Sequence, residues 1–90
     1  MKYDFEVELP DNWESRWGEA EAAAKKYDIL LNREGDRIEV RGQSPIGTIA
    51  ADILIDENNT AHVKITKKPM VVPKSLIESE VRKALNKLRE

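Results

Sequence analysis

Apolar and charged side chains alternate strictly from Lys2 to Leu9. A period of two with one charged side predicts a β-strand that has one face in a core and the other in water. The same period returns in four later segments, residues 29–31, 38–40, 48–56 and 61–65. The inward-facing residues of these segments are expected to be Ile29, Leu31, Ile38, Val40, Ile49, Ala51, Ile53, Ile55, Ala61, Val63 and Ile65. The pattern therefore predicts five strands.

Two turns set the expected strand pairing. In the first hairpin, pairing Leu31 with Ile38 leaves an even number of loop residues, which suits a two-residue turn in which Gly35 supplies a positive φ. In the second, pairing Ile53 with Val63 demands an odd loop. A three-residue turn with an Asn in the left-handed region fits that requirement. Both hairpins keep every apolar row on the same face of the sheet.

Two segments have the spacing of amphipathic helices. Asp11 with Glu14, and Ser75 with Glu78, match the capping box that begins many helices. The apolar stripe of the first helix is Trp13, Trp17, Ala20, Ala24 and Tyr27. The stripe of the second is Ile77, Val81, Ala84, Leu85 and Leu88. Because only one face of each strand is apolar, both helices should cover that face.

The order of elements is β-α-β-β-β-β-α. We therefore expect an α+β fold over residues 1–90, a single domain with a five-stranded antiparallel sheet and two helices packed on one face. Ninety residues suffice for one modest core and are too few for two. No apolar run approaches the roughly 20 residues that span a bilayer, and no signal peptide is visible. A cytoplasmic protein without a transmembrane segment is expected, and its oligomeric state stays open.

Charge argues against a nucleic-acid partner. The chain has 15 Lys plus Arg, 17 Asp plus Glu and a net charge of −2, which is unlike a domain that binds nucleic acid. Lys64, Lys67, Lys68 and Lys74 form a small basic group around a segment bracketed by prolines. Stacking aromatic side chains normally accompany such a group in nucleic-acid recognition, and residues 46–90 contain none. A solvated rim is the preferred interpretation of these lysines.

The chain offers little for catalysis or metal binding. It has no Cys and one His, which excludes disulfides, thiolate zinc sites and cysteine nucleophiles. His62 is expected on the outer face of the sheet near Asp52 and Lys64, and one imidazole rarely suffices for a metal. An enzyme would need Asp52 and His62 to converge in a cleft. We expect no catalytic residues, no metal and no cofactor.

Five apolar residues are the candidates for a binding surface: Trp13, Trp17, Met70, Val71 and Val72. The two tryptophans lie one turn apart on the first predicted helix, and the other three follow each other in the proline-bracketed connection. Either group can pack in the core. If Trp13 and the Met70–Val72 segment were exposed on the same side, they would form an apolar patch typical of a binding site.

The second helix, Ile77 to Leu88, resembles the end of the polyhydroxyalkanoic acid system proteins, a family of small domains often found with polyester-granule synthesis genes. Three further segments fit the resemblance: Lys25-Lys26-Tyr27, Glu34-Gly35-Asp36 with the strand after it, and Gly47-Thr48-Ile49. The similarity covers most of residues 15 to 89. It implies a bacterial protein without enzymatic activity whose role in the family is poorly defined.

The leading hypothesis is a small non-enzymatic accessory or binding protein, linked to polyhydroxyalkanoate granules, whose partner is a protein or the apolar granule surface. Its contact surface would be Met70, Val71 and Val72 with Trp13. The alternative is a domain that binds a small apolar ligand in a cavity between sheet and helices. Small inward residues could leave such a cavity or let the layers approach closely. These residues are Ala20, Ala24, Ala51, Ala61 and Ala84.

Overall fold

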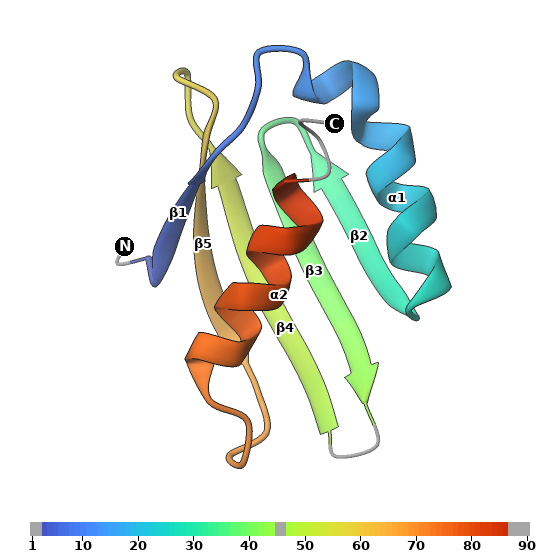
Figure 1. The fold of residues 1–90 in the computed structure, drawn as a ribbon, viewed down its shortest axis with the longest axis vertical. Coiled ribbons are helices and arrows are strands. Elements are labelled where there is room, and N and C mark those ends of the chain that lie inside the picture. Colours follow the sequence, from blue (N-terminus) through green and yellow to red (C-terminus); the bar gives the residue numbers. More distant parts are fainter. Residues whose placement is uncertain (1–2, 45–46, 87–90) are drawn as a thin grey trace.

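A computed structural model describes residues 3–44 and 47–86 of the chain. The elements of these residues are β1 (Phe5–Glu8), the 3-10 helix η1 (Trp13–Arg16), α1 (Trp17–Lys26), β2 (Ile29–Glu34), β3 (Arg37–Ser44), β4 (Gly47–Ile55), β5 (Thr60–Lys67) and α2 (Lys74–Asn86). Within the described part of the chain, five strands form one antiparallel sheet in the order β1-β5-β4-β3-β2. The two helices α1 and α2 lie on one side of it (Figure 1). The expected α+β fold and its element order are confirmed.

The hairpin of β4 and β5 has the predicted register. Ile53 pairs with Val63, and on the outer face Asp52 pairs with Lys64. The turn comprises residues 57–59 and is closed by a hydrogen bond from the Asp56 N–H to the Thr60 carbonyl, at 3.0 Å. Asn59 has a φ of +62°, as the odd loop length requires. An Asn tolerates this conformation better than most residues do.

The hairpin of β2 and β3 differs from the prediction by two residues. Leu31 pairs with Val40, and Ile38 pairs with Arg33, so the predicted pairing of Leu31 with Ile38 is wrong. The two-residue turn is confirmed: Gly35 has a φ of +61° and is followed by the second turn residue before Arg37. A shift by two residues keeps each side chain on its face, so the apolar pattern alone does not distinguish the two registers.

The core lies between the sheet and the helices. Alternate residues of the strands supply most of it, and Val63 is fully buried. Ile77 and Leu85 of α2 cover the centre of the sheet, while Trp13 of η1 covers one end. Trp17 and Val81 are partly buried against this cluster. The apolar stripes of both helices thus face the sheet, apart from Tyr27 and Ala84, which are exposed. The prediction that Ala84 faces inward is wrong, because the side of α2 that packs on the sheet is the one with Ile77, Val81 and Leu85. Leu88 lies outside the described residues.

Neither predicted capping box forms. The Asp11 carboxylate instead accepts a hydrogen bond from the Asn59 side-chain amide, at 3.1 Å, and the chain enters α1 through the 3-10 turn η1. At the second site, α2 begins at Lys74, so Ser75 lies inside the first turn. Glu78 accepts a hydrogen bond from Arg82 Nε at 2.9 Å. Both acidic groups therefore bind side chains rather than helix-terminal N–H groups.

Candidate functional site

The connection between β5 and α2 forms one end of the molecule (Figure 1). We call this connection, residues 68–73, the tip loop. It contains a tight turn in which the Val72 N–H donates to the Pro69 carbonyl, at 3.1 Å. Met70 and Val71 are the two corner residues of this turn, and their side chains are 97% and 77% exposed. Met70 is the most exposed large hydrophobic side chain in the described part of the chain.

The residues on either side of this corner fix it to the domain. Val72 is only 8% exposed and belongs to the core cluster. Pro69 packs over Gly47, where an added Cβ would lie 3.1 Å from Pro69 Cγ. Gly47 also has a φ of +140°, which residues with a side chain rarely adopt. Pro69 and Pro73 further restrict the backbone. The tip loop is thus a constrained turn that holds two apolar side chains in solvent.

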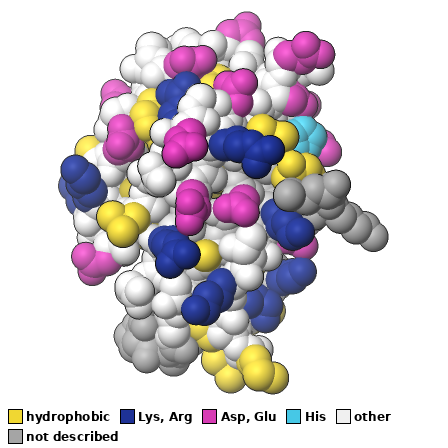
Figure 2. Space-filling view, turned by 180° about the vertical axis from the view of Figure 1, so that it is seen from behind, with side chains coloured by type: hydrophobic (Ala, Val, Ile, Leu, Met, Phe, Trp, Pro, Cys, Tyr) yellow, Lys and Arg dark blue, Asp and Glu magenta, His cyan; other side chains and the backbone are white. Residues whose placement is uncertain are grey.

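Lysines surround the tip loop. Lys67 ends β5, Lys68 begins the loop and Lys74 begins α2. Lys74 Nζ lies 3.0 Å from Asp4 Oδ1, and the Ile65 N–H donates to the other oxygen of this carboxylate at 2.7 Å. The bonds from Ile65 and then Lys74 hold the pKa of Asp4 below its usual range. Figure 2 shows hydrophobic side chains at the lower tip with Lys and Arg side chains above them.

Trp13 lies at the opposite end of the molecule, next to the turn between β4 and β5. It is 2% exposed, and its indole N–H donates to Asn59 Oδ1 at 3.1 Å. Trp17 packs edge-on against it, with ring centroids 6.3 Å apart. Of the predicted contact residues, only Met70 and Val71 are therefore exposed. The expected joint surface of Trp13 with the Met70–Val72 segment is wrong, because the core buries Trp13 and the length of β5 separates the two.

Arg33 takes part in the packing of these tryptophans, a role that the apolar pattern of the sequence does not predict. Its guanidinium carbon lies 4.6 Å from the ring centroid of Trp13 and 5.7 Å from that of Trp17. Arg33 Nε also donates to the Gly35 carbonyl at 2.8 Å, and a second nitrogen lies 3.2 Å from Glu14. Its position in the two-residue period could have indicated this role. Arg33 continues the inward row of Ile29 and Leu31, where a charged side chain needs partners.

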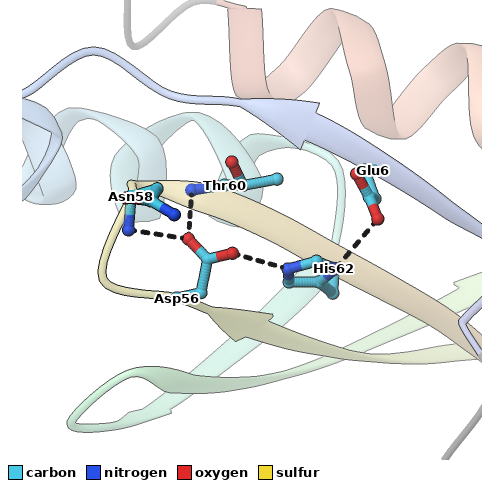
Figure 3. Close-up of polar contacts among 5 residues, drawn as sticks. All are labelled: Glu6, Asp56, Asn58, Thr60 and His62. Carbon is cyan, nitrogen blue, oxygen red and sulfur yellow. Dashed lines mark hydrogen bonds and ion pairs between the residues drawn. The ribbon is translucent and has the colours of Figure 1, made fainter.

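His62 joins two carboxylates on the outer face (Figure 3). Its Nε2 lies 2.8 Å from Asp56 Oδ2, and its Nδ1 lies 3.4 Å from Glu6 Oε1. The Asp56 carboxylate only accepts hydrogen bonds, so Nε2 carries the hydrogen. Only the doubly protonated ring donates to both partners. The expected neighbour Asp52 is not its partner. These contacts connect β1 and β5 to the turn that precedes β5.

Acid should destabilise the fold through Asp56. The hydrogen bond from His62, followed by that from the Thr60 N–H, lowers the pKa of this carboxyl. Because the folded pKa lies below the unfolded value of about 3.9, the stabilisation is complete above that pH and is lost as pH falls through the folded pKa. Urea unfolding at decreasing pH should show this loss below about pH 4.

The variant Asp56→Asn separates this carboxylate from the rest. It should be less stable than the wild type at neutral pH and should lose less further stability in acid. Glu57→Gln removes one negative charge from the same turn and controls for net charge. Equal neutral-pH stability of the two variants would contradict a role for the Asp56 bonds.

A shallow depression of about 200 Å³ lies on the outer face of the sheet. It is lined by Tyr3, Asn32, Glu34, Arg37, Ile38, Glu39, Asp52, Ile53 and Leu54. Asp52 is part of this lining and His62 is not, so the structure does not bring them together in a cleft. A smaller depression of about 50 Å³ lies between α1 and β2. Acidic and basic side chains both lie on the outer face (Figure 2).

Residues 3–44 and 47–86 contain neither a metal-ligand cluster nor a membrane-spanning helix. None of their His, Asp and Glu side chains form a group of three or more that could hold a metal ion. No helix among them is both long enough and apolar enough to cross a membrane.

Comparisons with known proteins do not assign the chain to a family. Its resemblance to the polyhydroxyalkanoic acid system proteins therefore stays an expectation, and the geometry of the tip loop is the main guide to function. Neither a scan against protein-family models nor searches of the curated proteins and of the solved structures found a match for this chain.

Proposed function

We propose that this chain is a non-enzymatic binding protein that docks through its tip loop on an apolar surface. The observation that carries the proposal is the exposure of Met70 and Val71, 97% and 77%, at the corner of a turn held in place by its neighbours. The tip loop is the part of the candidate contact surface that the structure leaves accessible.

Turn chemistry does not account for these two residues. Tight turns are usually built from Gly, Asn, Asp, Ser and Pro, which supply positive φ or local hydrogen bonds. Met70 and Val71 supply neither, and Val72 already provides the loop's contact with the core. Exposed apolar side chains gain free energy when a partner removes them from water, about 25 cal/mol per Å². Contact with an apolar surface therefore gives both residues a role.

The surface we propose is that of a polyester granule in a bacterial cytoplasm. The support for it is the resemblance of Ile77 to Leu88, and of three earlier segments, to the polyhydroxyalkanoic acid system proteins, which are often found with polyester-granule synthesis genes. The apolar polymer also complements Met70 and Val71 chemically. A constrained loop loses little conformational entropy on binding, which favours a small contact.

Cosedimentation with polyester granules tests this function. The wild type should sediment with the granules. Met70→Asp with Val71→Asp should lower the bound fraction at least tenfold, since two charges would have to leave water. The matched control is Tyr27→Asp with Leu30→Asp, because these two side chains are similarly exposed at another place. This control should bind like the wild type.

Circular dichroism of each variant establishes that the fold is retained. Absence of wild-type binding would remove the proposal, as would equal binding of the tip-loop variant and the wild type. Equal losses in the two double variants would also contradict it, because the effect would then follow from added charge and not from the tip loop.

The alternative, a domain that holds a small apolar ligand between sheet and helices, is less well supported. The depression between α1 and β2 has a volume of about 50 Å³, whereas a cavity that admits a benzene-sized ligand is about 150 Å³. Its lining also includes the charged residues Glu21 and Lys25. The exposed tip loop is the stronger observation.

A further inference from the structure

Positive charge is concentrated around the tip loop in a protein whose net charge is negative. From Asn58 to Ile77 the chain contains four lysines and no acidic residue, while its net charge is −2. Lys67 and Lys74 are exposed, and Lys68 is half-buried. Among the described residues, no carboxylate lies within ion-pair distance of Lys67 or Lys68. Their charges are therefore available to a partner.

The opposite end of the molecule is acidic. The turns between β2 and β3 and between β4 and β5 lie there together with η1 (Figure 1). The longest extent of the described structure is 36 Å. These segments carry the acidic residues Glu14, Asp36, Asp56 and Glu57 against one basic residue, Arg16. Figure 2 likewise shows acidic side chains gathered over the upper part and Lys and Arg over the lower part. This charge separation would turn the tip loop towards a negatively charged surface.

We propose that the tip loop binds an anionic phospholipid layer, with Met70 and Val71 inserted among the acyl chains and Lys67 and Lys68 at the headgroups. The inference deepens the proposed function and rests on it, because the docking element is the same. It adds the chemistry of the partner: an apolar interior covered by negative phosphate groups. Such a layer is found on bilayers and on lipid-coated particles.

The two parts of the tip loop match the two parts of such a layer. Apolar side chains at a turn can enter the boundary between headgroups and acyl chains while the backbone N–H and C=O groups stay outside the hydrocarbon. Lysine side chains reach outward from an apolar surface while their ammonium groups stay with water or phosphate. Each lysine near an anionic surface strengthens binding about fivefold. Binding strength grows with the buried apolar area and with the attraction to anionic lipids, so the two contributions act together.

Phospholipid fits these observations better than nucleic acid. Single-stranded nucleic acids are commonly bound by aromatic side chains on which bases stack. Residues 46–90 contain no Phe, Trp or Tyr, and the side chains at the tip are Met and Val. These aliphatic side chains gain most from an apolar interior.

Vesicle sedimentation tests the inference. The wild type should bind vesicles of phosphatidylcholine mixed with phosphatidylglycerol at least tenfold more strongly than vesicles of phosphatidylcholine alone, and high salt should weaken the binding. Met70→Ser with Val71→Ser should lower binding at least tenfold without adding charge. Lys67→Gln with Lys68→Gln should lower it roughly tenfold or more, given two lysines.

The matched control is Lys25→Gln with Lys26→Gln, which removes two exposed lysines at the end of α1 and should bind like the wild type. Equal binding to both vesicle types, or binding unchanged by either tip-loop variant, would overturn the inference. So would binding to a single-stranded oligonucleotide without binding to vesicles. Binding to bare polyester particles but not to anionic vesicles would overturn the inference and leave the proposed function intact, whereas binding to neither would remove both.

Discussion

Replacing Trp13 by alanine should lower the free energy of unfolding by about 3–5 kcal/mol. The indole is 2% exposed, so the substitution leaves a cavity beneath η1. It also removes the hydrogen bond to Asn59 and the ring on which Arg33 stacks. A single domain of this size has a total stability of roughly 5–15 kcal/mol. The loss is measurable by urea unfolding followed by circular dichroism, and it is a large fraction of the stability of the fold.

Two variants identify which part of the indole matters. Trp13→Phe keeps a ring in the site but removes the N–H donor, so it should cost less than Trp13→Ala while leaving the Asn59 acceptor unpaired. Trp17→Ala removes the partly exposed neighbour and should also cost less. A larger loss for Trp17→Ala than for Trp13→Ala would contradict the view that Trp13 anchors this end of the core.

The sheet was predictable because its two faces differ so strongly in polarity. Where apolar and polar residues alternate, the side-chain period assigns each residue to a face, and the parity of the loop then limits the register. Ile53 and Val63 were paired correctly for this reason, and Asn59 takes the left-handed conformation that the odd loop implied. The pairing of β4 with β5 therefore followed from the side-chain alternation and from the length of the turn between them.

The β2–β3 hairpin shows the limit of that argument. The last apolar residue of the inward row in β2 is Leu31, although that row continues to Arg33. The true register pairs Ile38 with that arginine. A partly buried guanidinium needs partners, and these come from Trp13, Trp17 and Glu14 of another segment. Spacing along the strand does not reveal them.

The predicted capping boxes at the two helix N-termini were wrong for a similar reason. Asp11 and Glu14 have the local spacing of a capping box, but Asp11 binds Asn59, which lies 48 residues away in the chain. A local pattern competes with every partner that the fold brings near. Glu78 likewise binds Arg82, and that pair lies within reach along the same helix.

The sequence identifies the apolar residues of the candidate site but does not show which of them are exposed. Met70, Val71 and Val72 are three similar residues in sequence, yet Val72 is in the core while the other two are in solvent. The turn bond between Pro69 and Val72 makes this division. Trp13 is equally apolar and is buried at the other end. Whether an apolar residue binds a partner or fills a core depends on what the tertiary structure leaves open.

Ile53→Ala should be the other strongly destabilising substitution, with a loss of about 2–5 kcal/mol in the free energy of unfolding. Ile53 is buried in the central strand β4, between Ile38 on β3 and Val63 on β5. Rigid strands on both sides prevent the site from collapsing around the smaller side chain, so the cavity persists. Urea unfolding at neutral pH measures the loss directly.

Leu54→Ala is the matched control, because Leu54 is the next residue of the same strand and its side chain points to the opposite face. There it lies partly exposed beside Arg37 and His62. It should cost about 1 kcal/mol or less, as partly exposed positions usually do. A similar loss for both variants would mean that the outer face is covered in solution, for instance by a second copy of the chain. A large difference follows only if one face of the sheet is core and the other is open to water.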